Sequence, residues 1–445
     1  MLRVSLTRPM ARALALAPAL VLWLAWASCS ASAADSPSAA GQSLTLDKAV
    51  DLAQLRSRQL ASQDAAAAAS REMALAVGQL PDPTLKAGVN NLPINGPDRL
   101  SLTRDFMTMR SVGVMQEFTR DDKRKARSAR FEREAGVAEA GRAVALANLR
   151  RDTAVAWLDR HYLERMRDLL KLLRAEAALQ IEAAGAAYRG GRGPQADVFA
   201  ARSAVAVIED RIRQMDIQVA TARTKLSRWV GPDAEASLAP PPDLATAALQ
   251  SGDLEIHLEH HPQVTMLASQ EAVARAEADV ARSNKQSDWS VELMYSQRGS
   301  AYSNMVAVNV SVPLQWDQKS RQDREVAARL ALAEQVRAQR EELTREHVAE
   351  VRNWLQQWQG NRGRLTQYDS SLILLASERT QASIAAYRGG SGALAAVLEA
   401  RRIEIDVRME RLRLEMPPTL PRFGKFAQPE WTPSSVARRP RCAPT

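Results

Sequence analysis

A stretch of about 65 residues, from Asp121 to Tyr188, contains no proline and only three glycines. An α-helix rises about 1.5 Å per residue, so an unbroken helix over this stretch is roughly 100 Å long. Residues 320–387 repeat the pattern. Helices of this length need a partner to pack against. Residues 195–229 and 393–416 are therefore predicted to return beside them as coiled-coil hairpins.

The two long stretches end in nearly the same turn. Residues 186–202 read AAYRGGRGPQADVFAAR and residues 385–401 read AAYRGGSGALAAVLEAR. Glycine permits the left-handed backbone that ends a helix, and proline suits the first turn of the next one. The turns are therefore predicted to be the hairpin tips. The predicted tip residues are Tyr188, Arg189, Gly190, Gly191, Gly193 and Asp197, and Tyr387, Arg388, Gly389, Gly390 and Gly392.

The turns belong to a longer internal repeat. LASQ at 60–63 recurs at 267–270, VMQEF at 114–118 corresponds to VSVPL at 310–314, and Lys123 corresponds to Lys319. Likewise Pro81-Asp82-Pro83 corresponds to Ser287-Asp288-Trp289. The sequence thus predicts two copies of one unit, each opening with a helix and followed by two strands. The predicted divisions are a signal peptide at 1–33, repeats at 34–230 and 245–416, a linker at 231–244, opening helices at 45–79 and 246–286, and an atypical tail at 417–445.

Four segments, 84–90, 111–119, 289–296 and 306–312, are predicted strands because apolar and polar residues alternate in them. Their length suits strands that cross a membrane at a tilt. Two soluble hairpins packed on the helices are the alternative. Four strands cannot close a barrel, so the membrane interpretation requires several copies of the chain. The predicted apolar face comprises Leu85, Val89, Val112, Val114, Trp289, Val291, Leu293, Tyr295, Val306, Val308 and Val310.

The N-terminus predicts export. Three arginines precede an apolar run and an Ala-Ser-Ala site, which favours cleavage after Ala33. Lipid attachment at Cys29 is an alternative. Of the formal charge of +9, the first 33 residues contribute +3 and the tail 417–445 contributes +4. The remaining body carries only +2, which argues against a nucleic-acid partner.

The sequence contains no recognised catalytic motif. The sequence has no nucleophile elbow, phosphate loop or CxxC pair, so we predict neither an enzyme nor a cofactor or metal site. His257 and His261 are spaced for one helix face, but Pro262 favours a helix start with solvated histidines.

Several motifs together resemble the outer-membrane factor family, the TolC-like exit ducts. These are LTLDKAVDLA (44–53), LPDPTLKAGV (80–89), VMQEFTRDDKRKAR (114–127), VSVPLQWDQKSRQD (310–323) and the paired Y-R-G-G-x-G turns. The likeness covers residues 44 to about 416. The tail 417–445 departs from the family, and reads as a disordered segment or as a shifted reading frame, which would put trimer assembly in doubt.

The resemblance implies a mostly α fold with a small transmembrane β part. Three chains would form one twelve-stranded barrel in the outer membrane of a Gram-negative cell and an α-helical tunnel through the periplasm. A periplasmic adaptor (membrane fusion) protein and an inner-membrane pump, of the RND type, would be partners. Residues 186–197 and 385–396 would form the adaptor contact and the gate. Asp197 matches an acidic family position, where the second copy has Ala396.

The stretch 106–118 looks most like the branch that serves heavy-metal pumps. Met107, Met109 and Met115 could then contact a soft metal, and apolar filling of the barrel rim is the alternative explanation. The alternative to an exit duct is a soluble periplasmic coiled-coil scaffold or adaptor, with its strands in a small β domain.

Overall fold

The computed structural model describes residues 43–242 and 261–416. The predicted signal peptide, Cys29, His257 and the tail 417–445 lie outside these residues.

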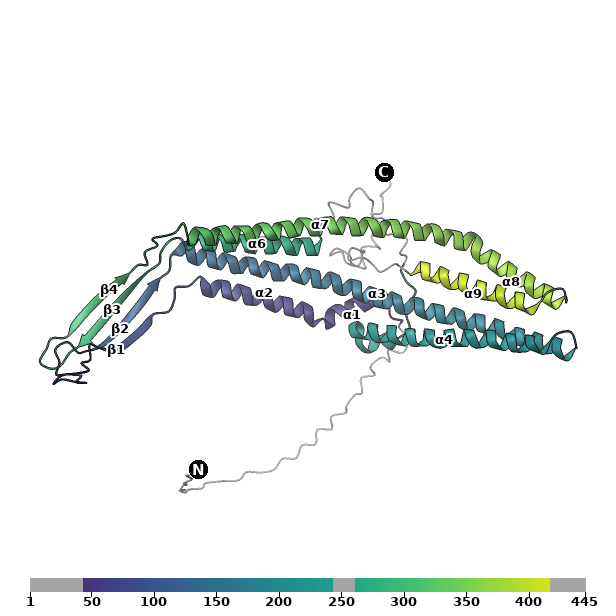
Figure 1. The fold of residues 1–445 in the computed structure, drawn as a ribbon, viewed down its shortest axis with the longest axis horizontal. Coiled ribbons are helices and arrows are strands. Elements are labelled where there is room, and N and C mark those ends of the chain that lie inside the picture. Colours follow the sequence, from purple (N-terminus) through teal and green to yellow (C-terminus); the bar gives the residue numbers. More distant parts are fainter. Residues whose placement is uncertain (1–42, 243–260, 417–445) are drawn as a thin grey trace, which may run out of the picture. The chain divides into compact units, whose positions relative to one another are not determined.

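The described chain is built from helices and four strands, labelled in Figure 1. In chain order they are α1 (Leu46–Arg56), α2 (Arg58–Val77), β1 (Thr84–Asn90), β2 (Met109–Phe118), α3 (Asp121–Arg189), α4 (Gln195–Val230), the 3-10 helix η1 (Gly231–Glu235), α6 (Pro262–Ser283), β3 (Trp289–Gln297), β4 (Met305–Ser311), α7 (Gln322–Gln367), the π-helical turn η2 (Tyr368–Leu372), α8 (Ile373–Arg388) and α9 (Leu394–Glu415).

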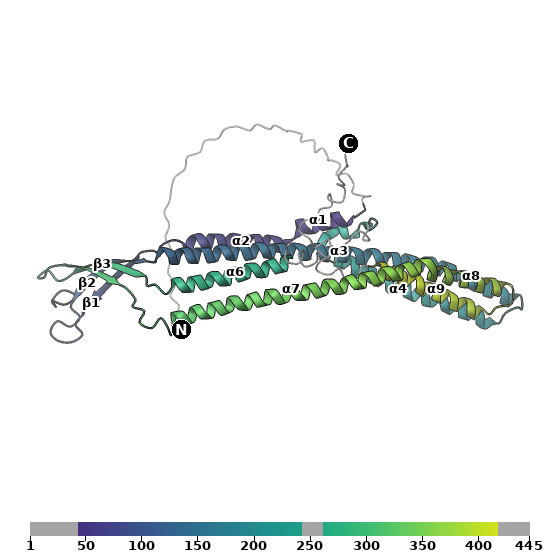
Figure 2. The same ribbon diagram turned by 90° about the horizontal axis from the view of Figure 1, so that it is seen from above.

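The four strands form one antiparallel sheet in the order β1-β2-β3-β4 (Figures 1 and 2). Each predicted hairpin is present, and β2 of the first repeat pairs with β3 of the second. Register is fixed by the pairs Thr84↔Met115, Phe118↔Trp289 and Ser290↔Ser311. The sheet therefore joins the two repeats within one chain.

The long helix α3 is the element on which the other helices pack. It contacts α4 along the first hairpin, and it contacts both α2 and α6 in the part that follows β2 (Figure 1). In the second repeat, α7 contacts α6, and α8 contacts α9. The predicted pairing of long and return helices is confirmed.

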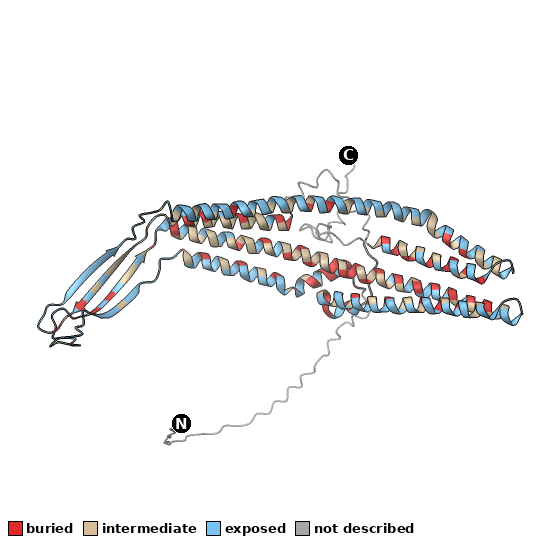
Figure 3. Cartoon of the chain, in the orientation of Figure 1, coloured by how far each residue is buried: buried red, intermediate tan, exposed pale blue. Residues whose placement is uncertain are grey.

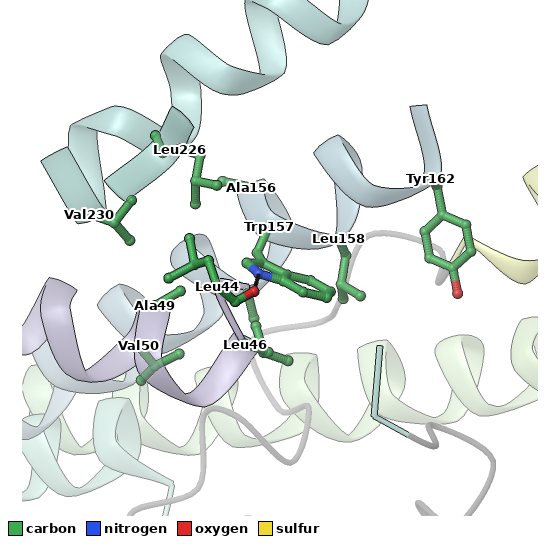
Figure 4. Close-up of a cluster of buried hydrophobic side chains, with 12 residues drawn as sticks. Leu44, Leu46, Ala49, Val50, Ala156, Trp157, Leu158, Tyr162, Leu226 and Val230 are labelled. Carbon is green, nitrogen blue, oxygen red and sulfur yellow. Dashed lines mark hydrogen bonds between the residues drawn. The ribbon is translucent and has the colours of Figure 1, made fainter. Parts of the chain in front are cut away.

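A core cluster forms where the chain enters α1 (Figure 4). The indole of Trp157 on α3 is fully buried, and its Nε1 donates a hydrogen bond to the backbone oxygen of Leu44 at 3.0 Å. Arg160, one turn further along α3, donates to the backbone oxygens of Ala234 and Ala236 at 2.5 and 2.8 Å. These contacts hold the start of α1 and the segment after α4 against the middle of α3.

Two helix predictions need correction. The opening helix at 45–79 is broken at Ser57, whose extended backbone ends α1 and whose hydroxyl caps α2 through Leu60 N. The stretch 320–387 is also interrupted, since η2 replaces one α-helical turn. By contrast, α3 is a single helix of 69 residues, and the hydroxyl of Thr45 caps α1 through Lys48 N.

The second opening helix was predicted over 246–286, and this is wrong at His261, which has an extended backbone and is the N-cap of α6 (Pro262–Ser283); residues 246–260 lie outside the described residues. This confirms the helix start that His261-Pro262 indicated. The expectation of a solvated His261 is wrong, because the ring is buried and packs edge-on against His347 with 4.8 Å between ring centroids.

Among the helices of residues 43–242 and 261–416, none combines the length and the hydropathy that a membrane crossing requires.

Trp157→Ala should lower the free energy of unfolding by about 3–5 kcal/mol, because it opens a cavity in the α1–α3–α4 core. Trp157→Phe keeps most of the ring but loses the bond to Leu44, and should cost only about 1–2 kcal/mol. Denaturation midpoints of the purified protein measure both variants. Equal losses would show that the packing of the ring is not what stabilises this core.

Candidate functional site: the sheet, its joint with the helices, and the hairpin tips

One face of the sheet is apolar and exposed across all four strands. Leu85, Val114, Leu293 and Val308 lie side by side in one row, because each is the register partner of the next. Leu85 is 71% exposed and Val308 is 64% exposed. Figure 3 shows β4 in pale blue along its length. A soluble protein rarely leaves such a continuous apolar face uncovered.

The opposite face of the sheet carries mostly polar or small residues, with Met115 and Met294 among them. Lys86 donates to Glu292 Oε2 at 3.1 Å across the intervening strand β2, where Gly113 lies opposite Lys86. Asn90 donates to Ser111 Oγ at 3.0 Å. Gly113 is required there, since a Cβ would come within 2.7 Å of the backbone oxygen of Leu293.

The residues of the predicted apolar face differ in exposure. Val291 is only partly exposed, while the other ten residues rank among the exposed large hydrophobic side chains. Trp289 also stacks on Phe118 with 4.4 Å between centroids, at the end of the sheet nearest the helices. The ten exposed residues are Leu85, Val89, Val112, Val114, Trp289, Leu293, Tyr295, Val306, Val308 and Val310.

Both outer edges of the sheet are open. Within the described residues β1 pairs only with β2, and β4 pairs only with β3. An edge strand presents unpaired backbone N–H and C=O groups that invite a further strand.

A buried ion pair joins the sheet to the helices. Lys123, in the first turn of α3, is 5% exposed and its Nζ lies 2.7 Å from Asp288 Oδ2, just before β3. Asp288 Oδ1 also accepts the backbone N–H of Arg120 at 3.0 Å. Lys123 Nζ donates further to the backbone oxygen of Gln286 at 3.1 Å. We call this the β2–β3 joint.

The pKa of the Asp288 carboxyl reflects the joint. Burial by itself would raise this pKa, but the hydrogen bonds from Lys123 and from the backbone of Arg120, with the charges of Lys123 and Arg127, outweigh burial. The pKa of Asp288 is therefore held below its ordinary value. The lysine and the aspartate each recur in the sequence repeat, but the repeat alone does not show that they pair.

The two hairpin tips have the same backbone. In the first, Gly191 N donates to Tyr188 O at 3.0 Å, and in the second Gly390 N donates to Tyr387 O at 3.1 Å. Gly191 and Gly390 have φ of 64° and 78°, whereas Gly190 and Gly389 have ordinary negative values. The second glycine of each pair is therefore the one that the turn requires.

The tips of the two hairpins pack on one another. Ala184 and Ala201 of the first share a buried cluster with Leu394 and Val397 of the second. Burial raises the pKa of the Tyr387 hydroxyl, and the negative charge of Asp197 raises it further. The structure thus brings two of the predicted tip residues, one from each repeat, close together.

Ion pairs tie the hairpins together further from the tips. Arg401 of α9 contacts Glu176 of α3 at 2.5 Å and the buried Glu404 at 3.1 Å. Arg211 of α4 contacts Asp406 of α9 at 2.9 Å. These pairs could not be predicted from the sequence, because helical spacing alone does not identify which faces of two hairpins meet.

The methionines of residues 106–118 do not converge. Met109 and Met115 lie six residues apart on β2, which is about 20 Å along a strand, so they cannot share one ion. Met107 lies in the loop before β2 and is half exposed. Among the described residues, no group of three or more His, Cys, Asp or Glu side chains is placed to hold a metal ion.

Comparison with known proteins shows the fold. Neither a family model nor a curated protein sequence matches the chain. Solved structures do match: a membrane protein from Pseudomonas aeruginosa (TM-score 0.70, 16% identity, 84% of this chain and 90% of that one), the CmeC outer membrane channel of Campylobacter jejuni (0.68, 12%, 83% and 82%) and the outer membrane protein VceC of Vibrio cholerae (0.64, 15%, 84% and 94%). The chain therefore has the fold of outer-membrane channel proteins.

Asp288→Asn should destabilise the chain by about 3 kcal/mol at neutral pH, because it leaves Lys123 charged and buried. A carboxyl whose pKa is lowered in the folded state contributes stability that is complete above its unfolded pKa of about 3.9. That contribution is lost as the pH falls through the lower folded value. The gap between wild type and variant should therefore be constant from pH 7 to about 5 and shrink below about 4.

Unfolding measured at several pH values tests this expectation. Asp64→Asn is the control, because its pair with Arg142 is exposed and should contribute less than about 1 kcal/mol. A gap for Asp288→Asn that did not shrink in acid would contradict the ionic basis of the joint.

Gly390→Ala should destabilise the second hairpin by about 1–2 kcal/mol, because alanine disfavours a positive φ. No atom lies within 4 Å of the added Cβ, so the backbone is the only source of the cost. Gly389→Ala is the matched control and should be neutral or mildly stabilising, since Gly389 has φ −74°. Thermal unfolding of both variants measures the difference, and equal effects would contradict the assignment.

Proposed function

We propose that the chain is an outer-membrane factor, the exit duct of a tripartite efflux system, which conducts substrate passively from the periplasm to the outside. Three copies would form one twelve-stranded barrel and a helical tunnel. The protein supplies a pathway and performs no catalytic step.

The observation that carries the proposal is the exposed apolar face of the sheet. Rows such as Leu85, Val114, Leu293 and Val308 run from one open edge to the other. Lipid can cover such a face, and the polar face with Lys86 and Glu292 then lines a water-filled lumen. The same strands continue into helices of roughly 100 Å, which suits a duct that crosses the periplasm.

The open edges support an assembly. In hydrocarbon every backbone polar group needs a partner within the protein, so a four-stranded sheet is not viable there alone. A repeated contact of β4 with β1 of the next copy is head-to-tail, and such contacts close into rings. The exposure of α7 agrees, since of its 46 residues only Ala333, His347 and Val351 are buried.

The tips are the proposed contact with a periplasmic adaptor protein and, through it, with an inner-membrane pump of the RND type. Tyr188 is about half exposed, and Asp197 and Tyr387 lie where the two hairpins meet. A gate at this end would require the hairpins to separate, which would break the pair of Arg401 with Glu176.

The structure gives less support for the identity of the transported substrate. A heavy-metal substrate was predicted from the likeness of residues 106–118 to one branch of the family. The separation of Met109 from Met115 gives no support for a metal site on β2.

A soluble periplasmic scaffold is the alternative function. It requires the apolar side of each strand pair to pack in a small β domain. The exposure of Val306, Val308 and Val310 disfavours such packing within one chain.

The experiment is to fractionate the cell envelope and measure the mass of the detergent-extracted protein by light scattering. We expect a trimer in the outer membrane. Val308→Lys with Val310→Lys should abolish its accumulation there, because a lysine on the lipid face costs about 2–4 kcal/mol at the midplane.

Asn309→Lys is the matched control. Asn309 lies between the two valines on the opposite face of β4, and its lysine would point into the lumen. A soluble monomer from the wild-type chain, or normal outer-membrane levels of the double-lysine variant, would reject the duct.

A further inference from the structure

The two strand hairpins of the chain are superimposable in register. β1 pairs Thr84 with Met115, and β3 pairs Ser290 with Ser311. The sequence repeat relates β1 to β3 by 206 residues and β2 to β4 by 196 residues, as Asp82 to Asp288 and Lys123 to Lys319. Adding these two offsets to the first register pair gives the second pair. The repeat seen in the sequence is therefore also a repeat of pairing.

The β2–β3 joint is then the contact of the first repeat with the second. It comprises the Lys123–Asp288 ion pair and the stacking of Phe118 on Trp289. The same offsets, applied to the residues of this joint, give an equivalent contact of the second repeat with the first. In that contact Lys319 corresponds to Lys123, and Asp82 corresponds to Asp288.

Both residues of the transferred pair are present and exposed. Lys319 lies in the turn before α7, and Asp82 lies just before β1. Within the described residues neither forms an ion pair or a side-chain hydrogen bond. They lie beside opposite edges of the sheet, so they cannot meet within one chain. They can meet only where two copies of the chain lie edge to edge.

We propose that Lys319 of one copy forms a buried ion pair with Asp82 of the next, so that the joint between copies repeats the β2–β3 joint inside each copy. The partner is a second copy of this chain. The proposal rests on the proposed function, since it specifies the contact by which the duct closes.

The proposal also fixes the register between copies. The pair Val114↔Leu293 becomes Val310↔Ala87, and Gly113↔Met294 becomes Asn309↔Gly88. In the transferred pair the glycine lies on the other strand, so Asn309 has a Cβ at the position where Gly113 has none. The Phe118–Trp289 contact becomes Leu314 against Pro83, and Leu314 is exposed in the single chain.

The helices repeat the relation. In the first repeat, α3 packs between α2 of its own repeat and α6 of the other. α7 packs on α6 of its own repeat, and its other side lacks the equivalent of that second neighbour in the described chain. α2 of the next copy is the equivalent. Exposed leucines are present on both helices, Leu75 on α2 and Leu330 on α7.

The first test reverses the charges. Asp82→Lys and Lys319→Asp alone should each lower the temperature at which the detergent-solubilised trimer dissociates. The double variant Asp82→Lys/Lys319→Asp should recover most of the loss, because opposite charges face one another again. Asp82→Lys with Lys125→Asp is the specificity control and should not recover, since Lys125 pairs with Asp121 in its own chain.

The second test measures register by disulfide formation, in a Cys442→Ser background. Copies with Ala87→Cys and copies with Val310→Cys, carrying different tags, are produced together and oxidised. Directly paired strand residues have the short Cα separation that a disulfide needs. A disulfide-linked heterodimer is expected for this pair, and much less for Ala87→Cys with Val308→Cys, which lies two residues away on the same face.

The outcomes separate the two proposals. Recovery by charge reversal together with the Ala87–Val310 cross-link supports the joint. A stable wild-type trimer in which the charge variants are additive and the cross-link prefers Val308 would overturn the joint and leave the duct standing. Failure of the wild-type chain to form any oligomer would overturn the duct, and the joint with it.

Discussion

Covering the long helix α3 is the constraint on which the rest of the molecule depends. A helix in a protein takes most of its stability from tertiary packing, and the buried positions of this 69-residue helix run from Lys123 to Ala184. Near the sheet α2 and α6 cover it, in the middle α1 and the segment around Ala234 cover it, and towards the tip α4 and α9 cover it. Each of these elements has its place because one section of α3 needs a neighbour.

The contrast with α7 shows what the single chain leaves unfinished. α7 follows β4 as α3 follows β2, yet only three of its 46 residues are buried, although α6 packs against it (Figure 3). The difference comes from the position of each helix. α3 lies between helices of both repeats, whereas α7 has a neighbouring helix of its own repeat on one side.

Much of this architecture could be predicted from the sequence. Proline-free stretches located α3 to within a residue, and alternation located all four strands to within about two residues, because helix breakers and period-two patterns are local signals. The break at Ser57 was missed because a serine that ends one helix and caps the next leaves the apolar spacing unchanged. The turn η2 was missed because a π turn has no residue signature of its own.

For the candidate site, the sequence pattern predicted the apolar face of the sheet and the glycines at the tips. It did not predict which glycine of each pair has the positive φ. The pairing of Lys123 with Asp288 was out of reach for a different reason. It joins residues 165 apart, and nothing local specifies such a partner. The available signal was that a lysine and an aspartate recur at equivalent places in both repeats. This recurrence indicated a repeat but not an ion pair.

The π turn η2 makes the two halves unlike. The first long helix is unbroken from Asp121 to Arg189, whereas the second runs from Gln322 to Arg388 with η2 between α7 and α8. A π turn takes up one residue and rotates every side chain beyond it by about 100°. Arg411 of α9 holds the turn through Asp369 at 2.6 Å. A ring of such chains would therefore alternate straight and bulged hairpins around its mouth, with threefold rather than sixfold symmetry, and a protein that docks there would meet two different grooves.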